Sequence, residues 1–142
     1  MIRFHAEEVK NAFTQRRLLS SWLKEIAANY GRKIGEINYI LCSDEYLLAM
    51  NQQYLDHDTY TDIITFDYSE GDIVSGDVYI SLPRIQENAT QYGVNEVNEL
   101  HRVIAHGLLH LCGLKDKSPS DQKKMKSAEN QSLESRPAML LK

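Results

Sequence analysis

The sequence has little cysteine, little proline and no long apolar stretch. Of its 142 residues, 2 are cysteines and 3 are prolines. Cys42 and Cys112 are too few to build a disulfide framework, so both thiols are expected to be reduced, without a disulfide partner. No run approaches the roughly 18 apolar residues of a membrane span, and the N-terminus lacks the apolar core of a signal peptide. These absences predict a soluble, cytoplasmic protein that binds no membrane.

The chain also has fewer basic than acidic residues. The chain carries 16 lysines and arginines against 20 aspartates and glutamates, a formal net charge of −4. This balance argues against a protein that coats nucleic acid by bulk electrostatics, although it is compatible with a local basic cleft on an acidic body. The 7 glycines and 3 prolines are too few for a fibrous or disordered chain. Length and composition therefore predict a single domain over residues 1–142.

Hydrophobic periodicity predicts alternating strands and helices. The expected strands cover residues 2–5, 33–42, 61–68 and 73–80. The expected helices cover about 8–30, 44–54, 82–92, 95–112 and 119–136. A polar loop is expected at 56–60, and the apolar tail at 139–141 is assigned no structure. The order β-α-β-α-β-β-α-α-α favours an α+β fold, a small mixed four-stranded sheet packed with helices.

Two histidines lie four residues apart in the helix expected at 95–112, in the segment His106-Gly107-Leu108-Leu109-His110. On an α-helix this spacing corresponds to a turn of about 40° and a rise of one helical turn, so both imidazoles can bind one metal ion. Gly113 can adopt a positive φ and end the helix, which lets the chain double back and bring Asp116 to the same ion. The pattern predicts that His106, His110 and Asp116 are metal ligands and catalytic residues.

The spacing of this motif equals that of metzincin-type peptidases, in which a third histidine stands where this chain has Asp116. The helix is therefore expected to be a zincin-like metal-binding helix. Two neutral histidines and one carboxylate leave Zn2+, one ion per chain, an open position for water, as in catalytic zinc sites. Gly107 occupies the position of the peptidases' general base, a glutamate, so peptidase activity by the usual mechanism is not expected.

A plainer interpretation is that His106 and His110 are helix histidines paired with backbone or carboxylate groups. The apolar residues around them indicate a buried helix, where unpaired histidines are costly, and this favours the metal. His57 and His101 are not added to the site, since His101 lies about 140° round the helix from His106. Cys112 is interpreted as a small buried residue.

Three sequence segments together resemble the YbeY family of bacterial endoribonucleases: His-Gly-Leu-Leu-His-Leu-Cys-Gly at 106–113, Thr-Asp-Ile-Ile-Thr-Phe at 61–66 and Gly-Asp-Val at 76–78. The resemblance covers about residues 35–135. It implies a metal-dependent, single-strand-specific endoribonuclease in ribosomal RNA processing, especially 16S rRNA 3′-end maturation, and in ribosome quality control. It also implies single-stranded RNA, rRNA and the small ribosomal subunit as partners.

Two departures from the family pattern bear on the site. Asp116 stands at the position of the family's third histidine. Leu55 follows Asn-Gln-Gln-Tyr where many members carry an arginine, which removes one candidate phosphate contact. Stabilisation of the transition state must then rely on the metal or on other cations.

The candidate cations are Lys115, Lys117 and Arg102, with further lysines at 123, 124 and 126. Lys115 and Lys117 flank Asp116 and are expected to bind substrate, with Thr61 and Thr65 lining the same cleft. Solvated lysines and ordinary β-propensity are the plainer interpretations. The segment Gly76-Asp77 indicates either a bulge or a close approach of the substrate backbone.

Three other functions stay open at this point. A zincin-like metallopeptidase would cleave unstructured protein substrates. A non-catalytic ribosome-assembly factor with a structural metal would keep rRNA processing in a ligand variant that still folds. A mononuclear iron oxygenase is the third, because two histidines and one carboxylate also form the facial triad of such enzymes. A redox-inert metal in the purified protein would argue against it.

Overall fold

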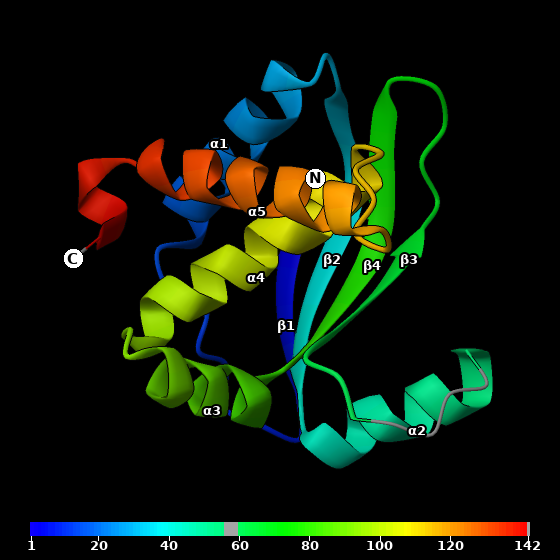
Figure 1. The fold of residues 1–142 in the computed structure, drawn as a ribbon, viewed down its shortest axis with the longest axis vertical. Coiled ribbons are helices and arrows are strands. Elements are labelled where there is room, and N and C mark those ends of the chain that lie inside the picture. The colour runs from blue at the N-terminus through cyan, green and yellow to red at the C-terminus, as the bar shows by residue number, and fades with distance from the viewer. Residues whose placement is uncertain (56–59, 142) are drawn as a thin grey trace.

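The computed structural model describes residues 1–55 and 60–141, and its strands and helices follow the predicted order (Figure 1). The elements are β1 (Ile2–Glu7), α1 (Arg16–Asn29), β2 (Lys33–Cys42), α2 (Asp44–Leu55), β3 (Ile63–Asp67), β4 (Ile73–Ser81), α3 (Leu82–Tyr92), α4 (Glu96–Leu111), α5 (Pro119–Glu134) and a 3-10 helix (Ala138–Leu141). Among the residues described, no helix combines the length and apolar character needed to cross a membrane.

The sheet has the strand order β1-β2-β4-β3. The pairs β1-β2 and β2-β4 are parallel, whereas β3 is antiparallel to β4 and forms one edge. This mixed sheet confirms the predicted α+β class. Alternating residues of β2, Ile37, Tyr39 and Leu41, are fully buried on one face, as expected when a strand presents every second side chain to a helical layer.

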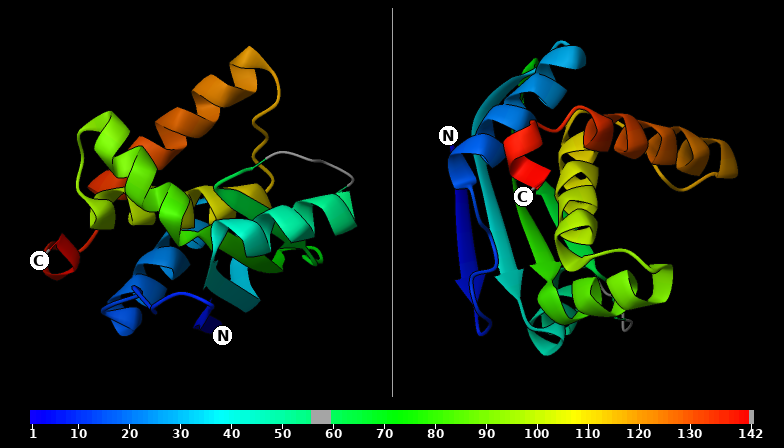
Figure 2. Two further views of the ribbon diagram at one scale, coloured as in Figure 1. Left: turned by 90° about the horizontal axis from the view of Figure 1, so that it is seen from below. Right: turned by 90° about the vertical axis from the view of Figure 1, so that its left-hand side faces the viewer.

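The helices cover the two faces of the sheet unequally. Helices α1, α3 and α4 share one apolar core with the buried face of β2 and β4, whereas Leu47 of α2 packs with Cys42 and Ile64 on the opposite face. Helix α5 packs against α4 and points away from the sheet (Figure 2, right). The candidate site lies on the α4 side, since α4 carries both histidines of the motif.

The first helix begins later than the sequence predicts. Residues 8–15 are not helical, and α1 starts at Arg16 after Gln15, which has a left-handed φ of 54°. Phe13 is nevertheless buried, with its ring centroid 5.0 Å from that of Phe4. The prediction was wrong here because Phe13 supplies an apolar residue to the core from a non-helical segment, and periodicity alone does not distinguish the two cases.

Smaller differences occur at three other places. Strand β3 begins at Ile63, so Thr61 and Asp62 precede it, and β1 extends to Glu7. The apolar tail forms the 3-10 helix, in which Leu140 is buried. Positions 56–59 of the expected polar loop, including His57, lie outside the described residues.

Two glycines allow α4 to lie close to the sheet. A Cβ built at Gly107 would come within 2.8 Å of Val78 Cγ1, and one at Gly76 within 2.8 Å of Leu111 Cδ2. Gly76 pairs in regular register with Ile37, and the irregularity of the β2-β4 ladder lies just before that pair, so the predicted bulge is not at Gly76. Its missing side chain instead makes room for the Phe66 carbonyl of β3, the nearest atom, and for Leu111 of α4.

His101 lies on the buried side of α4, as its angular position predicts. It is 3% exposed, its ring centroid is 5.7 Å from that of Trp22, and its Nδ1 accepts a hydrogen bond of 3.0 Å from Arg136. Burial, reinforced by the positive charge of Arg136, lowers the pKa of His101 to about 4. Trp22 and Cys112 are buried as well, so all three residues belong to the core.

Replacing Gly107 with alanine should destabilise the protein, although the same change in an exposed helix stabilises by about 1 kcal/mol. The new methyl group would press on Val78, and overpacking of this kind costs about 1–3 kcal/mol. Urea unfolding of Gly107→Ala should therefore show a lower midpoint than wild type. Ser127→Ala, on the exposed side of α5, is the control and should be neutral or slightly stabilising. A raised midpoint for Gly107→Ala would contradict the packing described.

His101 should make folding stability depend on pH. The unfolded chain protonates this histidine below its ordinary pKa of about 6.5, whereas the folded chain resists protonation until about pH 4. Stability is therefore fully present above pH 6.5 and is lost as pH falls, by about 2 kcal/mol between pH 6.5 and 5. In denaturant unfolding, His101→Gln should lose less stability than wild type as pH falls from 6.5 to 5. His5→Gln, at an exposed position, should lose as much stability as wild type. Equal pH profiles for all three proteins would refute this.

Candidate metal centre

His106 and His110 project from consecutive turns of α4 over the β3 side of the sheet. Asn95 caps the N-terminus of the helix, because its side chain accepts a hydrogen bond of 2.7 Å from the Asn98 amide. It ends at Leu111, and Gly113 follows with a φ of 104°, a conformation that glycine adopts without strain. The chain then turns back along α4, as predicted, and delivers Asp116 to both histidines.

The three side chains converge through one atom each. Asp116 Oδ2 lies 3.1 Å from His110 Nε2 and 3.4 Å from His106 Nε2. The potential ligand atoms of the group all lie within 4.8 Å of one another. Zinc bonds of 2.0–2.1 Å at tetrahedral angles place neighbouring ligand atoms roughly 3.3 Å apart. The distances from Asp116 Oδ2 to the two Nε2 atoms therefore fit ligands of one shared ion, and the group could hold such an ion.

The second ring nitrogens of both histidines are held by hydrogen-bond acceptors. His110 Nδ1 is 3.0 Å from the carbonyl oxygen of Leu114, and His106 Nδ1 is 2.6 Å from Glu129 Oε2. A carbonyl only accepts, so His110 Nδ1 carries the hydrogen, and in the neutral ring Nε2 presents a lone pair to Asp116. Two lone pairs facing each other at 3.1 Å require a cation or a proton between them, so either a metal ion or a protonated imidazole satisfies this contact.

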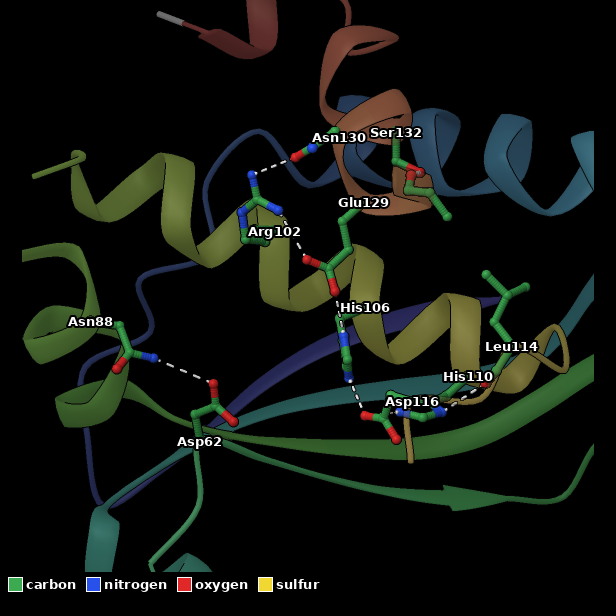
Figure 3. A network of polar contacts seen from close by, with 11 residues as sticks. Asp62, Asn88, Arg102, His106, His110, Leu114, Asp116, Glu129, Asn130 and Ser132 are labelled. Atoms are coloured by element: carbon green, nitrogen blue, oxygen red, sulfur yellow. Dashed lines mark hydrogen bonds and ion pairs between the residues drawn. The ribbon is translucent and has the colours of Figure 1, made fainter. Parts of the chain in front are cut away.

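Glu129 links His106 to Arg102 (Figure 3). Arg102 donates to Glu129 Oε1 and to the Asn130 side chain, both at 2.9 Å. Burial raises the pKa of Glu129, but hydrogen bonds from His106 and Arg102 outweigh it and lower the pKa overall. Burial lowers the pKa of His106, and the bond and charge of Glu129 reverse this, so the net pKa is raised. Glu129 is therefore ionised and fixes the orientation of the His106 ring.

A cleft of about 780 Å³ opens beside the three side chains. Of the residues predicted to bind substrate, Thr61, Thr65 and Lys117 line this cleft. Lys115 is exposed and is not among the lining residues. Leu55, at the position of the missing arginine, lines the cleft as well.

The wall of the cleft away from His110 carries two polar residues that the sequence did not predict to line it, Asn88 and Glu99, beside Asp62 of the segment at 61–66. Asn88 of α3 donates to Asp62 Oδ2 over 3.3 Å, and Glu99 of α4 is buried beside them. Burial raises the pKa of Glu99, and the nearby Arg102 opposes the rise. No short motif predicts this grouping, because its members come from α3, α4 and the residue before β3.

Glu129 was missed for a related reason. It lies 23 residues after His106 on another helix, and no local spacing connects the two. One signal was available: Glu129 shares the buried face of α5 with Met125, Ala128 and Leu133. A carboxylate on the apolar face of an amphipathic helix requires a buried partner.

The fold and the three converging side chains define an α+β protein with a candidate mononuclear metal centre. The model of the family described as Endoribonuclease YbeY matches residues 1–136. Endoribonuclease YbeY of Bacteroides thetaiotaomicron is 52% identical over 132 residues, 93% of this chain and 96% of that protein. The protein of that name from Phocaeicola vulgatus is also 52% identical, over 133 residues, 94% of this chain and 96% of its own length. The chain belongs to the YbeY endoribonuclease family.

A solved structure shares the fold of this chain. The solution structure of a protein from Thermotoga maritima is 30% identical and superimposes with a TM-score of 0.66. The match covers 94% of this chain and 87% of that chain. The fold and the family therefore agree across nearly the whole sequence.

Removing the charge of Glu129 should weaken metal binding without unfolding the protein. Glu129→Gln keeps the shape of the side chain but leaves His106 a less basic ligand with a less defined orientation. Losses of this kind are about 10- to 100-fold in metal affinity, measurable by competition with a chromophoric chelator. Glu134→Gln, at an exposed position of α5, should bind metal as wild type does. Equal affinities for both variants would contradict the positioning role.

Proposed function

We propose that this protein is a metal-dependent, single-strand-specific endoribonuclease that acts in rRNA processing, including 16S rRNA 3′-end maturation, and in ribosome quality control. The observation that carries the proposal is the convergence of His106, His110 and Asp116 in an open cleft. Family membership supports the RNA substrate, since relatives of this chain are named endoribonucleases. Single-stranded RNA, rRNA and the small ribosomal subunit are the proposed partners, and the cytoplasm is the proposed location.

In this proposal the three side chains hold one Zn2+, and α4 acts as a zincin-like metal-binding helix. A metal ion held there would supply Lewis acidity to a phosphodiester and would make a water molecule available as nucleophile. Glu129 and the Leu114 carbonyl keep both imidazoles oriented with Nε2 towards Asp116. Lys117 supplies positive charge to the substrate, and Thr61 and Thr65, which line the same cleft, contact it. Lys115, outside the cleft wall, would assist only through longer-range attraction of RNA.

The packing of α4 argues against the peptidase alternative. The zincin general base would have to be at position 107, where even a Cβ meets Val78 Cγ1 at 2.8 Å and Ile63 Cδ1 at 3.2 Å. That position faces the sheet and not the cleft, so no carboxylate placed there could serve the metal site. The openness of the cleft argues against a purely structural metal, because a structural zinc is normally closed by four protein ligands.

The proposal is tested by combining metal analysis with cleavage of a single-stranded rRNA fragment. Wild type should hold about one ion per chain, and His110→Ala and Asp116→Ala should lose both the ion and the cleavage, because each change removes one of three ligands. His5→Ala and Asp72→Ala, at exposed positions away from the cleft, are the matched controls and should retain both.

Circular dichroism and unfolding curves establish that the ligand variants are folded. Cleavage that survives loss of the metal in a folded variant would show that the nuclease mechanism is wrong. A protein that binds the metal and cleaves no RNA would support the assembly-factor alternative. A redox-active iron as the bound metal would favour the oxygenase.

A further inference from the structure

A second hollow of about 610 Å³ adjoins the metal cleft between α3, α4 and α5. We call it the α3–α5 groove. The two hollows share Tyr92, Arg102, His106 and Asp116 among their lining residues. The two hollows therefore meet at His106 and Asp116, two of the three candidate metal ligands. An enzyme that cuts within a chain must accommodate that chain on both sides of the scissile bond.

The chemistry of the groove suits a polyanion. Five residues line the groove but not the metal cleft: Val94, Asn98, Gln122, Met125 and Lys126. They include one lysine and no carboxylate. The groove shares three carboxylates with the cleft: Asp116 faces the two histidines, Glu129 is bonded to His106 and Arg102, and Glu99 is buried near Arg102. Phosphates that leave the metal site on this side would therefore encounter little repulsion.

Arg102 stands where the two hollows join. Its guanidinium bonds to Glu129 and Asn130 with two of its nitrogens, and its side chain is still 29% exposed. A guanidinium has five N–H donors in a planar fork, so this anchoring leaves donors for a phosphate and reduces the entropy lost on binding it. Cleft residue Leu55 provides no such donor.

The groove also offers an exposed aromatic ring. Tyr92, the last residue of α3, is 62% exposed and lines both hollows. Aromatic side chains beside a cationic groove bind unpaired bases by stacking. An exposed ring next to Arg102 and Lys126 is therefore the combination expected for a single-stranded segment, whose bases are free to stack.

We propose that the α3–α5 groove binds the single-stranded RNA on one side of the scissile phosphate, with Arg102 and Lys126 at its backbone and Tyr92 stacked on a base. This assignment rests on the proposed endoribonuclease function and extends it. It makes the groove, and not the metal cleft alone, responsible for the affinity for longer strands.

The test measures binding of single-stranded RNAs from about 4 to about 12 nucleotides to the full chain, in a chelator to prevent cleavage. Wild type should bind long strands more tightly than short ones. Tyr92→Ala should weaken long-strand binding by about fivefold or more. Lys126→Gln should lower the slope of log affinity against log salt by about 0.7, the loss of one phosphate contact. Short strands should bind Lys126→Gln as they bind wild type, because Lys126 lines the groove and not the metal cleft.

Two matched variants serve as controls. Lys123 lies on the same helix as Lys126, and Tyr68 is 60% exposed; neither lines the cleft or the groove. Lys123→Gln and Tyr68→Ala should bind both lengths of RNA as wild type does, and all variants should keep the wild-type metal content. A length effect that is equal in groove variants, controls and wild type would overturn the assignment.

The outcome separates this proposal from the function on which it rests. Normal cleavage by wild type, together with unchanged long-strand binding in Tyr92→Ala and Lys126→Gln, would refute the groove alone. A metal-loaded wild type that cleaves no RNA of any length would refute the proposed function. In that case length-dependent binding that Tyr92→Ala abolishes would still support a groove for single strands.

Discussion

The close contact between α4 and the sheet is the constraint on which the candidate site depends. Gly107 and Gly76 remove the side chains that would hold helix and sheet apart, and Val78 and Leu111 fill the space between them. The helix is thereby fixed in rotation as well as in distance. Because residue 107 must face the sheet, residues 106 and 110 lie towards the β3 edge and the cleft.

A second constraint comes from α5, which supplies Glu129. A histidine on a rigid helix still rotates about two side-chain bonds, and a ligand must present one particular nitrogen to the metal. Glu129 selects that nitrogen in His106, and Arg102 holds Glu129. The loop that carries Asp116 orients the His110 ring in the same way, because the Leu114 carbonyl accepts a hydrogen bond from His110 Nδ1. Each imidazole is thus restrained by a segment other than the one that carries it.

Local patterns in the sequence were sufficient for part of this arrangement. The order of strands and helices follows from periodicities within each segment, and the comparisons confirm the family to which the motif at 106–113 pointed. The approach of Asp116 was predictable because a glycine stop and five intervening residues leave few paths. The start of α1 and the partner of His106 were not, since Phe13 and Glu129 are explained only by contacts between segments distant in sequence. The roles of the site residues stay predictions.

The charges around the three converging side chains show why the groove and the cleft belong together. An aspartate in place of a third histidine adds a negative charge beside any phosphate that approaches the metal, and Asp62 and Asp67 add two more on the cleft wall. No arginine at position 55 offsets them. Among the described residues, the cations that line these hollows are Lys117 in the cleft, Lys126 in the α3–α5 groove and Arg102 in both. The phosphates of a bound strand should therefore lie towards Arg102 and Lys126. The bases would then face Asp62 and Asp67, whose carboxylates can accept hydrogen bonds from the donors of the bases.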